Sequence, residues 1–152
     1  MIYIASDHRG FELKNLVSES LRNDEKFPMT DVGPAEYDSS DDYIDYAEKV
    51  VELVLQDPAG NRGILICGSG HGMDITANKH KGIRAALALN SSVARQSREH
   101  ENTNVLVLAS DWLKPDEALE VVKAWLETDY SAEERHQRRL DKLQEIEGKN
   151  FK

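Results

Sequence analysis

The chain has 152 residues, of which 39% are apolar and 31% charged, a balance typical of a folded globular domain and not of a disordered segment. Its formal net charge is −9, and an acidic surface disfavours binding to DNA or RNA. No apolar run approaches the ~20 residues of a membrane-spanning helix and the first residues lack the pattern of a secretory signal, so we expect no membrane contact and a cytoplasmic location.

Short apolar runs alternate with longer segments of helical periodicity along the whole chain. The apolar runs predict strands at residues 2–6, 28–32, 63–67, 84–89 and 104–109. Amphipathic spacing predicts helices at residues 10–23, 42–56, 73–81, 91–100, 115–127 and 131–148. This alternation predicts one α/β domain over residues 1–152. We expect a doubly wound parallel sheet of about five strands, Rossmann-like or flavodoxin-like, with a C-terminal helix.

Three of the predicted helices begin at residues typical of helix starts. Pro115 suits the first turn of its helix, where a missing N–H costs little. Ser91 or Ser92 is the expected N-cap of the fourth helix. Ser131 and Glu134 have the spacing of a capping box, which predicts that the last helix begins at Ser131.

Ligands of parallel α/β folds bind beyond the carboxyl ends of the strands, so residues directly after strands are the first candidates for a site. Asp7 and His8 follow the first predicted strand in the sequence SDHRG. Two interpretations stay open for this segment. Asp7 caps the helix that follows, or His8 faces a polar or anionic ligand.

The third predicted strand ends at Cys67, in the sequence CGSGHG. Gly68, Gly70 and Gly72 let backbone N–H groups approach a ligand closely. A helix that begins after the loop lowers the pKa of a nearby thiol, so Cys67 is either a reactive thiolate or an inert buried cysteine at a strand end. As the only cysteine, it excludes an intramolecular disulfide and a multi-cysteine zinc site.

Basic residues gather near the end of this acidic chain. Arg135 and Arg139 are one helical turn apart, and guanidinium groups suit phosphate oxygens. The alternative is a solvated helix face paired with neighbouring acids. His100 ends the fourth predicted helix, where a histidine often only complements the helix dipole.

Taken together, these segments resemble the ribose-5-phosphate isomerase B family, which also includes the galactose-6-phosphate isomerase subunits. The matching segments are IASDHRGFELK at 4–14, DVG at 31–33, DDYIDYA at 41–47, CGSGHGM at 67–73, ANKHKGIRAAL at 77–87, SREHENTNVL at 97–106 and ERHQRRLDKL at 134–143. The resemblance implies isomerisation of ribose 5-phosphate to ribulose 5-phosphate through an enediolate, with no metal and no cofactor. It also implies a homodimer or dimer of dimers whose active site lies at the subunit interface.

The resemblance further implies roles for individual residues. Catalytic roles fall on Cys67 as the base, Ser69 as a group that stabilises the enediolate, and His100 as the group that opens the furanose ring. Substrate contacts are implied for His8, Arg135 and Arg139 at the phosphate, Asp7 and Tyr43 at sugar hydroxyls, His136 as a second ring-opening candidate, and Gly68, Gly70, Gly72 and Glu101 around the substrate.

Four positions depart from the family pattern. Glu101 stands where Asn is common, His71 where Ile or Asn is frequent, and Asp74 where Ser is frequent. Asp111 occupies a position where relatives often carry an arginine near the phosphate. An acid there would repel a phosphate by about 1–4 kcal/mol, and Arg9, where relatives often carry Ala, is a candidate for the compensating cation.

Three alternative functions stay open at this point. The chain could isomerise another phosphosugar, such as a tetrose, allose or galactose phosphate, with the same base and loop. It could bind a sugar phosphate without catalysis. A nucleotide- or flavin-binding module on the same fold is the third alternative, because fold does not fix function.

Overall fold

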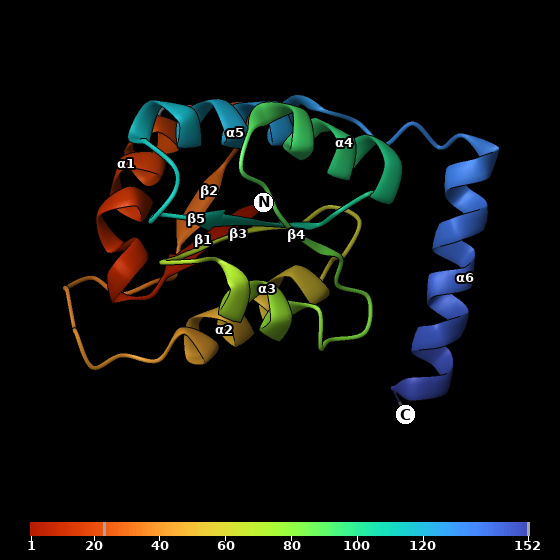
Figure 1. Ribbon diagram of the computed structural model, residues 1–152, viewed down its shortest axis with the longest axis horizontal. Helices are drawn as coiled ribbons and strands as arrows, with labels where there is room; N and C mark the ends of the chain where they lie inside the picture. The colour runs from red at the N-terminus through yellow and green to blue at the C-terminus, as the bar shows by residue number, and fades with distance from the viewer. Residues whose placement is uncertain (23, 152) are drawn as a thin grey trace.

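The computed structural model describes residues 1–22 and 24–151, arranged around a five-stranded parallel sheet (Figure 1). The strands are β1 (Ile2–Ser6), β2 (Met29–Asp31), β3 (Arg62–Cys67), β4 (Ala85–Leu87) and β5 (Val105–Ala109). Their order is β2-β1-β3-β5-β4, and each neighbouring pair is parallel. The expected doubly wound α/β fold is confirmed. The chain turns back between β1 and β3, the switch point at which such sheets bind ligands.

Helices cover both faces of the sheet (Figure 1). They are α1 (Phe11–Arg22), α2 (Tyr43–Leu55), α3 (His71–Ala77), α4 (Ser91–Glu101), α5 (Pro115–Glu127) and α6 (Glu134–Asn150), with a short 3₁₀ turn η1 (His8–Gly10) before α1. Helices α1, α4 and α5 pack on one face, and α2 and α3 on the other. None of the helices in the described residues is long and apolar enough to cross a membrane.

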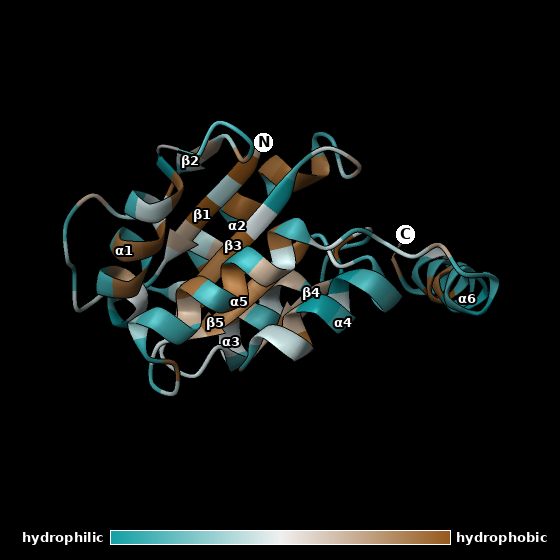
Figure 2. Ribbon diagram, turned by 90° about the horizontal axis from the view of Figure 1, so that it is seen from above, coloured by the Kyte–Doolittle hydropathy of each residue, from teal (hydrophilic) through white to brown (hydrophobic). Residues whose placement is uncertain are grey.

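Alternate residues of the central strands enter the two apolar layers, as the two-residue period of a strand requires. In β3, Ile64 and Ile66 pack with α1 and α5, whereas Leu65 and Cys67 pack with α2 and α3. Because both faces are buried at the centre of the sheet, β5 and most of β1 and β3 are apolar, which Figure 2 shows as brown ribbon through the centre. Cys67 therefore belongs to the α2–α3 side of the sheet.

Helix α6 stands apart from the sheet and its two layers (Figures 1 and 2). It touches α4, where His136 packs against His100 with ring centroids 4.2 Å apart. Further along the helix, Leu143 and Ile146 are exposed. An amphipathic helix with an exposed apolar face is typical of a segment that packs on a neighbouring chain.

Element boundaries differ from the prediction most clearly at α3. The expected helix over 73–81 begins two residues earlier and ends at Ala77. Asn78 ends it, because the Asn78 side chain accepts a hydrogen bond from Ala85 N and donates one to Ala85 O, which ties the turn to β4. Strands β2 and β4 are shorter than expected, and the predicted first helix begins with η1, while Asn23 at its end lies outside the described residues.

The predicted N-cap of α4 was wrong by one residue. Asn90 is the cap: its backbone is extended and its Oδ1 accepts a hydrogen bond from Val93 N at 2.9 Å. Ser91 and Ser92 both lie inside the first turn. Asn and Ser are about equally favourable as N-cap residues. Residue type alone therefore does not distinguish Asn90 from the serines that follow it.

The predicted start of the last helix at Ser131 was also wrong. Ala132 has a φ of 50°, which is incompatible with a helical turn, and α6 begins at Glu134. The Ser131 hydroxyl lies 2.9 Å from Nδ1 of His136 and so fixes that ring. The capping-box spacing is therefore present in the sequence but serves a side-chain contact.

Candidate active site

Two loops at the carboxyl edge of the sheet, after β1 and after β3, carry the first group of candidate residues. Cys67 ends β3, is 4% exposed, and is followed by a turn in which Gly70 has a φ of 79°. Backbone N–H groups of Gly70 and Met73 point to the thiol. The turn thus wraps donors around the sulfur, as the glycine pattern predicts.

The expectation of a lowered pKa for Cys67 is wrong for this protomer. Burial raises the pKa of the thiol above its ordinary value, and the charges of Asp7 and Asp111 add to this effect. Hydrogen bonds from Gly70 and Met73 act in the opposite direction but are weaker. The thiol is therefore the predominant form at neutral pH.

The other glycines of the loop allow close approach of two side chains. A Cβ on Gly68 would lie 2.5 Å from Nε of Arg9, and one on Gly72 would lie 2.6 Å from Cζ of Tyr43. Tyr43, at the start of α2, is therefore packed over the loop. Ser69 is half-buried between the two glycines, and its Oγ lies 3.4 Å from His71 N.

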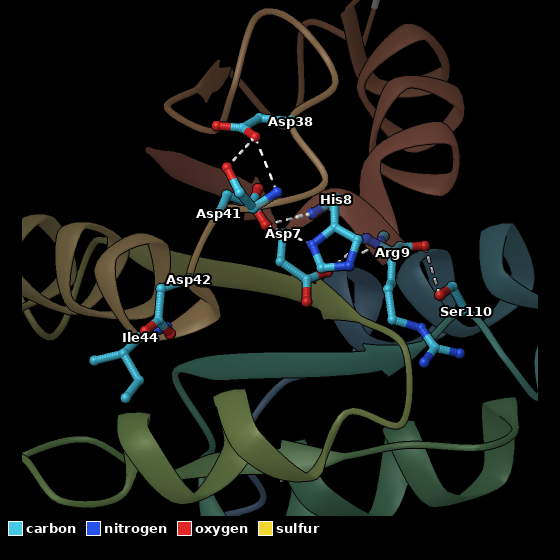
Figure 3. A network of polar contacts seen from close by, with 10 residues as sticks. Asp7, His8, Arg9, Asp38, Asp41, Asp42, Ile44 and Ser110 are labelled. Carbon is cyan, nitrogen blue, oxygen red and sulfur yellow. Dashed lines mark hydrogen bonds and ion pairs between the residues drawn. The ribbon is translucent and has the colours of Figure 1, made fainter.

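Asp7 caps the turn after β1. Its Oδ1 accepts hydrogen bonds from Arg9 N at 3.0 Å and from Gly10 N at 3.1 Å. Burial raises the pKa of Asp7, as does the nearby charge of Asp41. His8 projects from the same turn, and its Nδ1 lies 2.6 Å from Oδ1 of Asp41 (Figure 3). The capping interpretation of Asp7 is thus correct, and it leaves His8 facing away from the helix.

Arg9 and Asp111 form an ion pair across the mouth of the loop. One guanidinium nitrogen of Arg9 lies 2.8 Å from each carboxylate oxygen of Asp111. Ser110, beside Asp111, bonds the carbonyl oxygens of Arg9 and Cys67 through its hydroxyl. The proposed compensation of Asp111 by Arg9 is therefore realised inside the protomer, and it joins the ends of β1, β3 and β5.

The second group of candidate residues lies at the opposite edge of the sheet. His100 and Glu101 end α4, just before β5 begins, and so lie near the amino ends of the strands. Cys67 is level with Ala109 at the other end of β5, about 13 Å further along a strand. Within one protomer the structure thus separates His100 and Glu101 from the Cys67 loop.

The basic residues of α6 belong to this second group. His136 is 2% exposed, next to His100. Arg135 and Arg139 are exposed, and Nε of Arg135 lies 2.8 Å from Oε2 of Glu133. The sequence left open whether these arginines pair with neighbouring acids, and Arg135 does so with Glu133.

Sequence reasoning missed Asp41, which the structure brings to His8. It lies within the segment DDYIDYA, but residues 33–40, which lead into that segment, show no regular period. Its contact depends on the path of the loop over residues 33–41, which no local pattern describes. Among the described residues, no group of three or more His, Cys, Asp or Glu side chains is arranged to hold a metal ion.

Comparison with known proteins supplies independent findings. The family model described as Ribose/Galactose Isomerase matches residues 2–143. Ribose-5-phosphate isomerase B of Mycobacterium tuberculosis strain H37Rv is 38% identical over 146 residues, which cover 96% of this chain and 89% of that one.

Solved structures agree with this match. The crystal structure of ribose-5-phosphate isomerase B from Mycoplasma genitalium with bound ribulose-5-phosphate has a TM-score of 0.93 at 40% identity, covering 98% of this chain and 97% of that one. Ribose-5-phosphate isomerase B from Clostridium thermocellum has a TM-score of 0.90 at 41% identity, covering 97% of each chain.

Proposed function

Because this chain belongs to the ribose/galactose isomerase family, we propose that it interconverts ribose 5-phosphate and ribulose 5-phosphate, with residues 1–152 as one isomerase domain. One observation carries the proposal. Cys67 ends a central strand at the switch point of the sheet, inside a loop that turns backbone N–H groups toward it. The structure from Mycoplasma genitalium, whose match covers 98% of this chain and 97% of that one, was solved with ribulose-5-phosphate bound. This supports the choice of substrate.

The proposed reaction moves one proton between neighbouring carbons. The thiolate of Cys67 removes the proton from C2 of the open-chain aldose, and the electron pair of that bond forms the C1–C2 double bond of an enediolate. The carbonyl electron pair moves onto O1, which takes up the hydroxyl proton of O2. The thiol then returns its proton to C1 while the electron pair on O2 forms the carbonyl at C2, which yields the ketose and restores the thiolate. The Ser69 hydroxyl and the backbone N–H groups of residues 68–72 stabilise the charge on oxygen, and one such donor contributes about 2.7–4 kcal/mol in known cases.

We also propose that the complete site forms between two copies of the chain, as a homodimer or a dimer of dimers. The proposal needs His100 to open the sugar ring near Cys67, yet the two lie at opposite edges of one protomer. The His100 edge of one copy, with Arg135, His136 and Arg139, would face the Cys67 edge of the other. The exposed apolar residues of α6 support such an assembly.

A cytoplasmic location is part of the same proposal. Cys67 is a free thiol, and a thiol that acts as a base must stay reduced. The cytosol maintains free thiols, whereas oxidising compartments do not.

Isomerisation of another phosphosugar, such as a tetrose, allose or galactose phosphate, is the second candidate. The ion pair of Arg9 with Asp111 favours this second candidate. At the end of β5, next to the loop, the pair is neutral overall, whereas relatives often carry a positively charged arginine at position 111. Binding of a sugar phosphate without catalysis would leave the thiol unused, and thermal stabilisation without turnover would identify it.

Steady-state isomerisation assays on a panel of tetrose, pentose and hexose phosphates test the proposal. The wild type should convert ribose 5-phosphate fastest, and Cys67→Ala should lose activity by about 10²–10⁴-fold, the usual contribution of a general base. Ser20→Ala, at an exposed position on α1, is the control and should keep full activity. Turnover of none of the panel would contradict the proposed function, and full activity in Cys67→Ala would remove its base.

A further inference from the structure

The loop over residues 33–41 folds back onto the end of β1 and places the Asp41 carboxylate beside the Nδ1 edge of the His8 ring (Figure 3). One oxygen, Oδ1, accepts the backbone N–H of His8 at 3.1 Å and lies 2.6 Å from Nδ1 of the same residue. The Asp41 side chain is only 5% exposed, whereas that of His8 is 27% exposed. The carboxylate is thus a buried support for a ring that reaches solvent.

This contact determines which ring nitrogen is free. A carboxylate oxygen only accepts hydrogen bonds, so Nδ1 of His8 carries a proton and donates it to Asp41. Nε2 lies on the opposite side of the ring and points away from Asp41 (Figure 3). Tyr37 packs against the ring edge-on, with centroids 6.2 Å apart, and further limits its rotation.

The Asp41 carboxylate is buried, and only one of its two oxygens has a hydrogen-bond partner in the described part of the chain. The other oxygen is Oδ2. The pKa of neighbouring Tyr46 is raised, chiefly by burial and then by the charge of Asp41. Asp7, which also faces the ring, is a second buried carboxylate. The direct hydrogen bonds of the Asp41 side chain are to His8, and the Tyr46 hydroxyl lies near the same carboxylate, so the acid is held against the histidine ring.

We propose that Asp41 is a positioning residue that holds His8 as a doubly protonated ring, with Nε2–H directed at the phosphate of the substrate. The inference rests on the proposed function and on the phosphate contact that the resemblance to the isomerase family implies for His8. A neutral ring with its proton on Nδ1 would present a lone pair to the phosphate from Nε2, which is repulsive. Between two anions the ring donates from both nitrogens, and each charge-assisted bond is stronger than a neutral one.

A double-mutant cycle on Asp41 and His8 tests the coupling. Asp41→Asn should raise KM for the sugar phosphate by about tenfold and leave kcat within about twofold, because it weakens binding equally in the ground and transition states. His8→Ala should raise KM at least as much, and the double variant should be no worse than His8→Ala, since the two act through one contact. Asp24→Asn is the control, because its exposed carboxylate accepts the backbone N–H of Lys26 beyond the end of α1 that is distant from His8, and it should leave KM unchanged.

Nitrogen NMR of the histidine rings gives a readout that a merely structural role would not move. In the wild type saturated with the equilibrated sugar phosphates, both His8 nitrogens should carry protons, and His8→Ala identifies the signals. In Asp41→Asn, at most one nitrogen should be protonated under the same conditions. An unchanged KM, a loss confined to kcat, or a wild-type ring with only one proton would overturn the inference.

Nitrogen NMR of the protein without substrate distinguishes failure of this inference from failure of the proposed function. Without substrate, the wild-type His8 spectrum should show a proton on Nδ1, and Asp41→Leu, which offers no acceptor, should remove the preference for Nδ1. If the wild type turns over no phosphosugar while inorganic phosphate still protonates both nitrogens, the proposed function fails and the role of Asp41 stands. If Nδ1 carries no proton in the free wild type, the role of Asp41 fails whatever the activity.

Discussion

Cys67 needs its thiolate form to act as a base, and its surroundings oppose that form. Because burial and two nearby carboxylates raise its pKa, little thiolate is present at neutral pH. The rate constant kcat/KM should therefore rise with pH and level off only above the ordinary thiol value of about 8.5. Measurement over about pH 6 to 10 checks this, and an inflection at or below the ordinary value would contradict it.

Asp111→Asn should move that pH profile to lower pH. The substitution removes a negative charge that raises the pKa of Cys67, so the thiolate forms at a lower pH than in the wild type. Asp116→Asn, an exposed acid on α5 that does not act on the thiol, is the control and should leave the profile in place. Coincident wild-type and Asp111→Asn profiles would show that Asp111 has no influence on the base.

Gly70→Ala should damage both the loop and the activity. Gly70 has a φ of 79°, and a Cβ there would collide with the side chain of Leu87, so we expect a loss of about 1–3 kcal/mol in stability. The displaced N–H also faces Cys67, and kcat should fall at least about tenfold. Gly148→Ala is the matched control, since a Cβ there meets no atom within 4 Å and favours the helix. Chemical denaturation and steady-state kinetics on both variants would test this.

Residue contacts near in sequence were predictable in their geometry, whereas for the distant Arg9–Asp111 contact the sequence suggested only the two partners. The cap by Asp7 and the glycine turn after Cys67 follow from local pattern, and the structure contains both. The pair of Arg9 with Asp111 joins residues 102 positions apart. Its pairing could be suggested from opposite charge, but its geometry depends on the order of the strands.

At the scale of elements, Asn90 sets the start of α4. Asn90→Ala removes the side-chain acceptor for Val93 N and should lower the free energy of unfolding by about 1 kcal/mol, the usual effect of losing a cap. Ser91 and Ser92 lie inside the helix, so Ser91→Ala and Ser92→Ala should each change the free energy of unfolding by no more than about 0.5 kcal/mol. Equal losses in all three variants would show that the cap contributes nothing specific.

Strands and helices were predicted in type and order, because both apolar periods are strong in this chain. The local sequence pattern does not predict which strands lie side by side in the sheet. β5 lies between β3 and β4, so β4 and not β5 is the edge strand on that side of the sheet, and its three residues are only half-buried. α3 illustrates the same limit, because Asn78 ends it by bonding β4, which is adjacent in space.

At the scale of the molecule, α6 should decide the assembly. Leu143→Lys and Ile146→Lys place charges on its exposed apolar face, and we expect dissociation of the oligomer and loss of isomerase activity without unfolding of the protomer. Sedimentation, activity and circular dichroism on the same samples measure the three properties. Glu145→Lys, exposed on the same helix, is the control and should stay assembled. A fully active monomer would contradict the shared site.

The two tryptophans occupy contrasting places in the molecule. Trp125 is fully buried, with the guanidinium groups of Arg62 and Arg98 within 6 Å of its ring, whereas Trp112 is 56% exposed and packs edge-on against His71 at the mouth of the loop. The two indoles therefore lie in different environments, and the buried one should emit at a shorter wavelength than the exposed one. The first reports whether the fold is intact, and the second reports what arrives beside Cys67.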